Sequence, residues 1–224
     1  MESAFINGIE LRTEVSENYV QINDIQGEDL AQIWEPLTKA YPGFELCLCF
    51  RNMPAPVDVL AGIGAYILDD CLEMRVTPQE YKPHNNPEIT LLTKDDFAEF
   101  AALHDVLNSE ESGMYWTSRR IWNKWDGWRI FVVKADGKII GYGMIMVMMR
   151  DGLMGEIFCV EADSPEHRKA LISAMAGCAF DCGKEVVLYM VDREGPRSPH
   201  EYDAATAVGF RETGYYTGYQ VDEI

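Results

Sequence analysis

The chain has 224 residues, of which 47% are hydrophobic, so it can build a substantial core and is not intrinsically disordered. Its formal net charge of −18 argues against a nucleic acid or an anionic membrane surface as a partner. No apolar run reaches the roughly 18 residues of a membrane span, and Met1–Val15 lacks the pattern of a signal peptide, so we expect a cytoplasmic location.

The cysteines do not fall at the spacing of metal ligands. Cys47 and Cys49 are two apart in a strand pattern, and Cys178 and Cys182 are four apart in a helical one, so each pair shares a face. Neither spacing is CxxC and histidine is scarce. The sequence therefore predicts no metal site and favours buried free thiols in a reducing compartment.

The first third of the chain alternates helical and strand patterns after an N-terminus that could hold a short strand or a sheet edge. The expected elements are a helix over Gly27–Tyr41, a strand over Phe44–Phe50, a short helix over Val57–Ile63 and a strand over Asp70–Val76. The polar segment 82–88 contains two prolines, which neither continue a helix nor sit inside a sheet. We therefore expect an α/β subdomain in residues 1–81, a linker at 82–88 and a second domain in residues 89–224.

The second domain also mixes helices and strands. Asp136-Gly137 lies between two alternating apolar runs, which is a strong hairpin signal. The strand Glu156–Val160 turns directly into a long helix over Pro165–Cys182. The whole domain is expected to run as a strand at 89–92, two helices, the hairpin strands 128–135 and 138–149, the strand and helix just named, a strand at 185–191, a helix ending at Gly209 and a last strand.

This order, the hairpin Phe131–Val147 and the ending Ala205–Val221 resemble the GNAT (GCN5-related) N-acetyltransferases. The resemblance implies an α/β fold, in the broader sense that includes α+β, with a mixed β-sheet flanked by helices. It also implies that a bulge splays the strand through Glu156–Val160 from its neighbour. Val57–Val76 can further be aligned with Tyr202–Val221. Residues 1–81 are then a truncated GNAT-like repeat, or the two helix-Gly-strand units simply look alike.

The resemblance implies a transferase that moves an acetyl group from acetyl-CoA to a primary amine of a small molecule or peptide. The backbone of Phe158, Cys159 and Val160 would hold the cofactor, and Glu156 would be the general base. In many members of the family the general acid is a tyrosine four residues before the Gly-Phe pair. That position is Ala205 here, so Tyr202, one turn earlier, is the candidate general acid. The sequence does not decide between a monomer and a homodimer.

The family's pyrophosphate motif, Arg/Gln-x-x-Gly-x-Gly/Ala, falls on Asp163–Arg168, which contains no glycine. Pro165 also removes one N–H donor. The side chains of His167, Arg168 and Lys169 either compensate as cofactor-binding groups or form a solvated first helical turn. The alternative to an enzyme is therefore a catalytically degenerate GNAT-fold protein with a binding or regulatory role.

Overall fold

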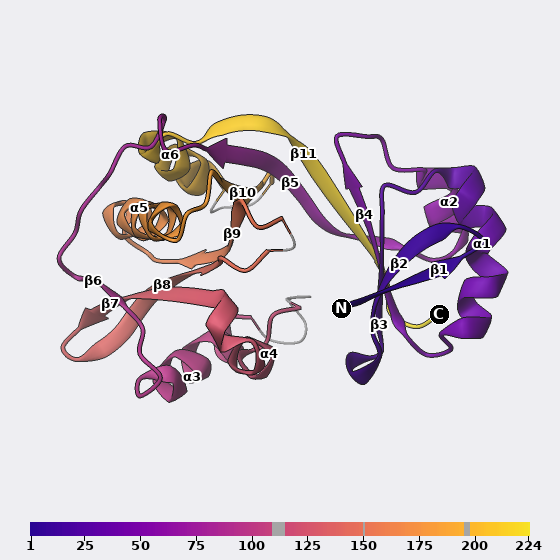
Figure 1. Cartoon of the computed structure of the whole chain (residues 1–224), viewed down its shortest axis with the longest axis horizontal. Coiled ribbons are helices and arrows are strands. Elements are labelled where there is room, and N and C mark those ends of the chain that lie inside the picture. The colour runs from indigo at the N-terminus through magenta and orange to yellow at the C-terminus, as the bar shows by residue number, and fades with distance from the viewer. Residues whose placement is uncertain (109–114, 150, 195–197) are drawn as a thin grey trace. The chain divides into compact units, whose positions relative to one another are not determined.

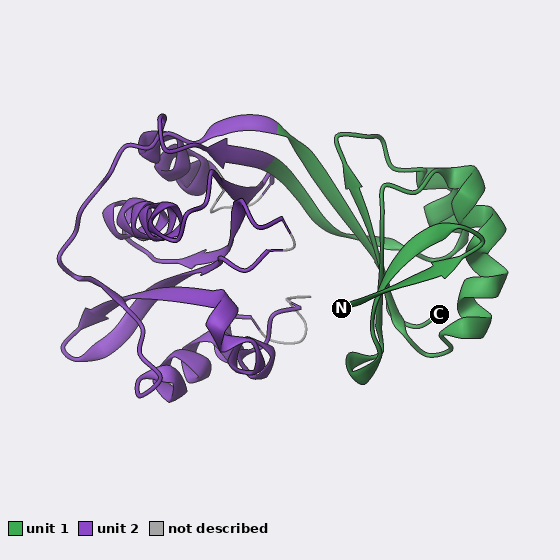
Figure 2. Cartoon of the chain, viewed as in Figure 1, with its two compact units in different colours: residues 1–72, 214–224 green, residues 73–213 purple. Residues whose placement is uncertain are grey.

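The computed structural model describes residues 1–108, 115–149, 151–194 and 198–224 (Figure 1). The chain divides into two compact units, residues 1–72 with 214–224 and residues 73–213 (Figure 2). We call them unit 1 and unit 2. Strands β5 (Tyr66–Val76) and β11 (Arg211–Val221) each contribute residues to both units. Among the described residues, no helix has the length and apolar character needed to cross a membrane.

Unit 1 contains a sheet with strand order β1-β2-β3-β4-β11-β5. Its other elements are β1 (Glu2–Ile6), β2 (Ile9–Glu14), β3 (Tyr19–Asn23), α1 (Gly27–Ala40), β4 (Glu45–Arg51) and α2 (Val57–Gly62). Strands β3 and β4 are parallel, and β11 pairs antiparallel with β4. The predicted succession of helix, strand, helix and strand over residues 27–76 is confirmed.

The two helices of unit 1 pack on one face of its sheet. Leu30, Ile33 and Leu37 of α1 and Leu60 of α2 are buried in one cluster with alternate residues of β4, namely Leu46, Leu48 and Phe50. Successive side chains of a strand point to opposite faces. Cys47 and Cys49 therefore lie on the face of the sheet away from α1 and α2.

Unit 2 contains strands in the order β5-β10-β9-β8-β7-β6. Its elements are β6 (Ile89–Leu91), α3 (Phe97–Leu107), α4 (Ser118–Asn123), β7 (Trp128–Ala135), β8 (Lys138–Met146), β9 (Met154–Glu161), α5 (Pro165–Asp181), β10 (Val186–Asp192) and α6 (Ser198–Val208). Strands β6 to β9 pair antiparallel, and β9 and β10 are parallel. The predicted fold class, a mixed sheet flanked by helices, is thus confirmed.

Helices cover both faces of the sheet of unit 2. Leu171, Ile172 and Met175 of α5 pack on one face with Ile157 and Val160 of β9. On the other face, Phe100 of α3 and Ile121 of α4 pack against Trp128 and Tyr142, and Cys159 of β9 joins this cluster. Strand β9 therefore lies between two apolar layers.

The predicted hairpin joins β7 and β8. Ala135 pairs with Lys138, and the two turn residues between them have positive φ, 49° at Asp136 and 76° at Gly137. These are the angles of a two-residue turn whose twist matches that of the strands. The tight turn predicted from the Asp-Gly sequence is therefore confirmed.

Candidate functional site

Strand β9 contains a one-residue bulge at Phe158. Met144 and Ile145 are adjacent in β8, but they pair with Cys159 and Ile157, so Phe158 is the extra residue on the β9 side. A bulge bends its strand and increases the local twist. This bend occurs in the middle of β9, next to its parallel neighbour β10.

The pairing of β9 with β10 stops at the bulge. Ile157 opposite Tyr189 is the last pair, although β9 continues to Glu161 and β10 to Asp192. Among the described residues 151–194, the ladder between the two strands therefore ends before the strands do. The backbone of Phe158 and Val160 lies beside this edge, where an extended ligand could bind.

A cluster of titratable side chains lies at the open end of these strands. Glu201, in the first turn of α6, accepts a hydrogen bond from the Tyr189 hydroxyl. Burial and the charge of Asp192 raise the pKa of Glu201 to about 7, against the opposing effect of Arg168. A carboxyl group that titrates near neutral pH can accept a proton from a substrate under physiological conditions.

Arg168 is the buried cation of this cluster. Its side chain is 5% exposed, and its Nη2 donates to the carbonyl oxygen of Ala162 at 2.5 Å. Its Nε finds no hydrogen-bond partner among the described residues. An unsatisfied buried donor costs free energy, so this atom is available to an acceptor at the end of β9.

The first turn of α5 is capped by side chains. Ser164 accepts a hydrogen bond from the backbone N–H of His167 at 3.4 Å, and Pro165 has no N–H to offer. Lys169 forms an ion pair with Glu166 at 2.8 Å, and His167 contacts Glu88 at 2.8 Å. The hydrogen bond and charge of Lys169 lower the pKa of the fully exposed Glu166. The side chains of His167 and Lys169 are thus already engaged with carboxylates on the surface.

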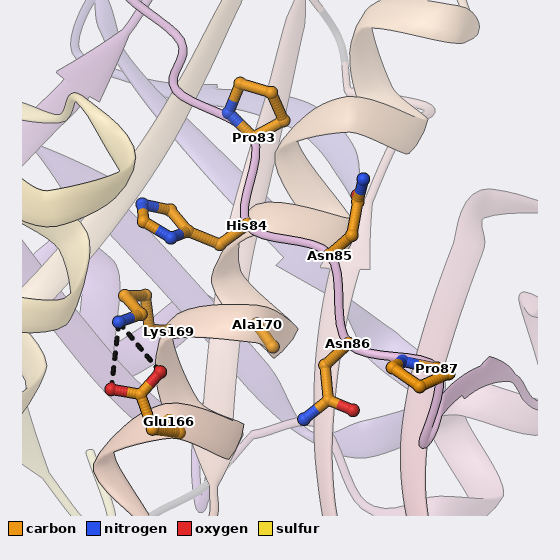
Figure 3. A pocket seen from close by; sticks show the side chains of 8 residues that line it. All are labelled: Pro83, His84, Asn85, Asn86, Pro87, Glu166, Lys169 and Ala170. Carbon is orange, nitrogen blue, oxygen red and sulfur yellow. Dashed lines mark hydrogen bonds and ion pairs between the residues drawn. The ribbon is translucent and has the colours of Figure 1, made fainter.

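A pocket of about 300 Å³ lies beside this turn. Figure 3 shows the segment Pro83–Pro87 along one side and Glu166, Lys169 and Ala170 of α5 along the other. The segment is held to α5 because the backbone N–H of His84 donates to Ser173 Oγ at 2.8 Å. The predicted linker at 82–88 is therefore packed within unit 2 and shapes the surface near the start of α5.

The two predicted catalytic residues lie on different elements. Glu156 is half-buried on β9 and pairs with Met146 on one side and Leu188 on the other. Tyr202 is 37% exposed on α6. The residue that α6 directs towards β10 is its neighbour Glu201, which the sequence analysis missed. A glutamate in the first turn of a helix following a strand was the available signal.

Aromatic rings pack against the bulge residue Phe158 on the face of the sheet that α3 and α4 cover. The ring of Phe158 lies 6.0 Å from that of Trp116 and 5.3 Å from that of Trp128, between centroids. The carbonyl oxygen of Trp116 accepts a hydrogen bond of 2.7 Å from Nε2 of the buried His104. Trp116 is thereby held beside Phe158.

His104 and Tyr142 are further residues that the sequence analysis missed. Because Nε2 of His104 faces a carbonyl, its Nδ1 is the acceptor for the Tyr142 hydroxyl at 2.7 Å. Asn108 donates to the same hydroxyl at 2.8 Å. Burial lowers the pKa of His104 and raises that of Tyr142, so both side chains stay neutral.

No protein-family model matches the sequence, and a search of curated protein sequences also finds no match. Solved structures do match. A conserved protein of unknown function from Staphylococcus epidermidis aligns over 100% of this chain and 94% of its own, with a TM-score of 0.70 and 12% identity. A GCN5-related N-acetyltransferase from Kribbella flavida aligns over 98% and 88%, with a TM-score of 0.64 and 10% identity.

A third match is described as a tandem GNAT protein. This tandem GNAT protein of the clavulanic acid biosynthesis pathway aligns over 97% of this chain and 80% of its own, with a TM-score of 0.59 and 11% identity. At such low identities the likeness concerns the fold. Together with the bulged, splayed β9, these matches show that the chain has the fold of the GNAT N-acetyltransferases.

Proposed function

We propose that this protein is an acyltransferase that moves an acetyl group from acetyl-CoA to a primary amine of a small molecule or peptide. The observation that carries the proposal is the end of the β9–β10 ladder at Ile157, next to the Phe158 bulge. A strand edge released in this way can hydrogen-bond an extended chain through its backbone. The pantetheine arm of coenzyme A, which contains two amides, is such a chain.

Binding of the nucleotide end of coenzyme A at the start of α5 would depend on side chains. The capped start of α5 offers no glycine cradle for a pyrophosphate. Lys169 is in a surface ion pair and His167 contacts Glu88 at the surface. Surface contacts of this kind are worth little and can exchange a carboxylate for a phosphate. Arg168 adds buried positive charge and an unsatisfied Nε at the same end of β9. We assign these three residues to the phosphates and the backbone of Phe158, Cys159 and Val160 to the arm.

The thioester of acetyl-CoA supplies the activated acyl group. On the protein side, Glu156 and Glu201 are the candidate bases for the attacking ammonium group. Glu201 is the stronger candidate because its pKa of about 7 suits proton transfer near neutral pH. Its neighbours Glu161 and Asp192 add negative charge that favours a cationic amine. Tyr202, exposed on α6, is the proposed proton donor to the leaving thiolate.

One observation favours a second function. Ser164 and Pro165 leave few free N–H groups at the start of α5, and Glu166 places negative charge where a phosphate would bind. These features suit a GNAT-fold protein that no longer binds acetyl-CoA and instead has a binding or regulatory role. The two functions differ in one measurable property, the affinity for acetyl-CoA.

Isothermal titration calorimetry of the full chain with acetyl-CoA separates the two functions. The transferase proposal predicts a micromolar dissociation constant that weakens as salt is raised, because phosphates contribute to binding. Lys169→Ala should weaken binding severalfold, whereas Lys138→Ala, at the start of β8 beside the hairpin turn, should leave it unchanged. Absence of heat at millimolar acetyl-CoA would reject the transferase and leave the binding role.

A further inference from the structure

A second chemical site lies in unit 1, on the face of the sheet away from α1 and α2. Strand β4 presents Cys47 and Cys49 there, each 6% exposed. Their sulfur atoms are 3.6 Å apart, and both cysteines are free thiols. The two sulfur atoms are thus in direct contact, so that a sulfur oxidised at one position lies within reach of the thiol at the other.

Hydrogen-bond donors converge on the sulfur of Cys49. The hydroxyl of Tyr216 lies 3.0 Å away and Nε2 of Gln21 lies 3.4 Å away. Burial raises the pKa of Tyr216, so its hydroxyl stays protonated and donates. The Cys47 thiol is a third donor. Hydrogen bonds to a thiolate favour the ionised form.

The two cysteines are therefore unequal. The hydrogen bond from Cys47 lowers the pKa of Cys49, and the bonds from Tyr216 and Gln21 add to this against the effects of burial and the charge of Asp69. The pKa of Cys47 is raised because it donates to Cys49 and is buried, and these effects outweigh the hydrogen bond from Tyr19, which acts in the opposite direction. Cys49 is thus the better nucleophile and Cys47 the thiol that keeps its proton.

Glycine at position 218 leaves room for this arrangement. Gly218 is the residue of β11 that pairs with Cys49. A Cβ atom at this position would lie 3.2 Å from the Tyr216 hydroxyl and 3.1 Å from Asp69 Oδ2, closer than most real contacts. The missing side chain therefore lets Tyr216 reach the sulfur of Cys49.

The geometry does not resemble a metal site. No group of three or more His, Cys, Asp or Glu side chains in the part of the chain that the structure describes is placed to hold a metal ion. Cys47 and Cys49 supply two sulfurs, without a further pair of ligands among the described residues that is placed to complete a tetrahedral site, so tight binding of zinc is not expected. The remaining chemistry of a nucleophilic thiol beside a protonated one is two-electron oxidation.

We propose that Cys49 and Cys47 form a hydroperoxide-reactive dithiol. The Cys49 thiolate attacks one oxygen of a hydroperoxide ROOH, so that an S–O bond forms and the O–O bond breaks. The leaving RO⁻ takes up the proton that the Cys49 thiol released on ionising and departs as ROH, which leaves a sulfenic acid on Cys49. Cys47 then attacks the Cys49 sulfenic acid, its proton leaves with the hydroxyl as water, and a disulfide forms. The dithiol loses two electrons, and the hydroperoxide is reduced to ROH and water.

Two features fit a small oxidant and a reversible product. The low exposure of both sulfurs admits hydrogen peroxide more readily than a bulky disulfide. Residues two apart in an extended strand have Cα atoms about 6.4 to 6.8 Å apart, at the upper end of the range that disulfides span, and parallel Cβ vectors. Closing the disulfide therefore requires β4 to bend locally at Leu48, which brings the two Cβ atoms together. This site is independent of the acyl-transfer proposal, since it lies in unit 1 and uses other residues.

Peptide mass spectrometry after treatment with hydrogen peroxide tests the proposal on the full chain. The tryptic peptide Ala40–Arg51 contains Cys47 and Cys49 and no other cysteine. We expect it to lose two hydrogens at peroxide concentrations that leave the equally buried Cys71 unchanged. Cys47→Ser should accumulate a sulfenic acid on Cys49 that dimedone traps, and Cys49→Ser should abolish oxidation of Cys47.

Tyr216→Phe is the matched control for the hydrogen-bond geometry. Loss of one hydrogen bond to a charged group should slow oxidation of the peptide about tenfold. Circular dichroism checks that each variant is folded, and the wild-type comparison of Cys49 with Cys71 needs no variant. Oxidation of Ala40–Arg51 no faster than that of the Cys71 peptide, or an unchanged rate in Tyr216→Phe, would overturn the proposal.

Discussion

Glu201→Gln is expected to stabilise the protein at alkaline pH and to have little effect at acidic pH. In the folded protein the pKa of Glu201 is about 7, above its usual value of 4.5. Between these values the folded protein keeps a proton that the unfolded chain has released, so stability falls as the pH rises through this window. The separation corresponds to at most roughly 3 kcal/mol by pH 8.

Glutamine carries no charge and can still accept the hydrogen bond from Tyr189. Because Glu201 is partly accessible to water, we expect a gain of about 1 to 3 kcal/mol at pH 8 and about zero at pH 4. Urea unfolding of both proteins at several pH values measures this difference. Glu212→Gln, at an exposed position of β11, is the matched control for the loss of one carboxylate. A stability difference for Glu201→Gln that does not change with pH would refute the assignment of a raised pKa.

Two further substitutions test the hydrogen bonds of His104 and the turn of the β7–β8 hairpin. Tyr142→Phe removes the hydroxyl that donates to Nδ1 of the buried His104 and leaves only Asn108 Nδ2, 3.4 Å from that nitrogen. We expect a cost of about 1 to 3 kcal/mol in urea unfolding; a cost below about 0.5 kcal/mol, the range of a surface change, would contradict the network. Gly137→Val places a branched side chain at a φ of +76° and should destabilise the hairpin by about 1 to 2 kcal/mol. An unchanged thermal midpoint would count against the turn geometry.

Elements governed by local chemistry could be predicted from the sequence. Asp136-Gly137 identified the β7–β8 hairpin because its positive φ angles depend on those two residues alone. Asn7-Gly8 is the same signal and joins β1 to β2, with φ of 49° and 86°. The sequence analysis left this region open as a short strand or an edge, because the flanking strands lack clear apolar alternation.

Features that depend on contacts between elements far apart in the sequence could not be predicted from the residues alone. The bulge at Phe158 is a mismatch between β9 and β8, so only the family resemblance anticipated it. The raised pKa of Glu201 requires β10, α5 and α6 to meet. The domain limits at 81 and 89 remain a prediction, because β11 at the end of the chain pairs with β4 near its beginning, which no division into consecutive segments captures.

The central claim is that the bulge in β9 opens an edge that binds acetyl-CoA. Deleting Phe158 would join Ile157 directly to Cys159, matching adjacent Ile145 and Met144 in β8 and restoring a regular ladder. Calorimetry of wild type and this deletion variant with acetyl-CoA, after circular dichroism has shown that both are folded, tests the claim. The account predicts micromolar binding to the wild type and a loss of at least about tenfold, or 1.4 kcal/mol, in the variant. Equal affinity of the two proteins, or no binding to the wild type, would contradict it.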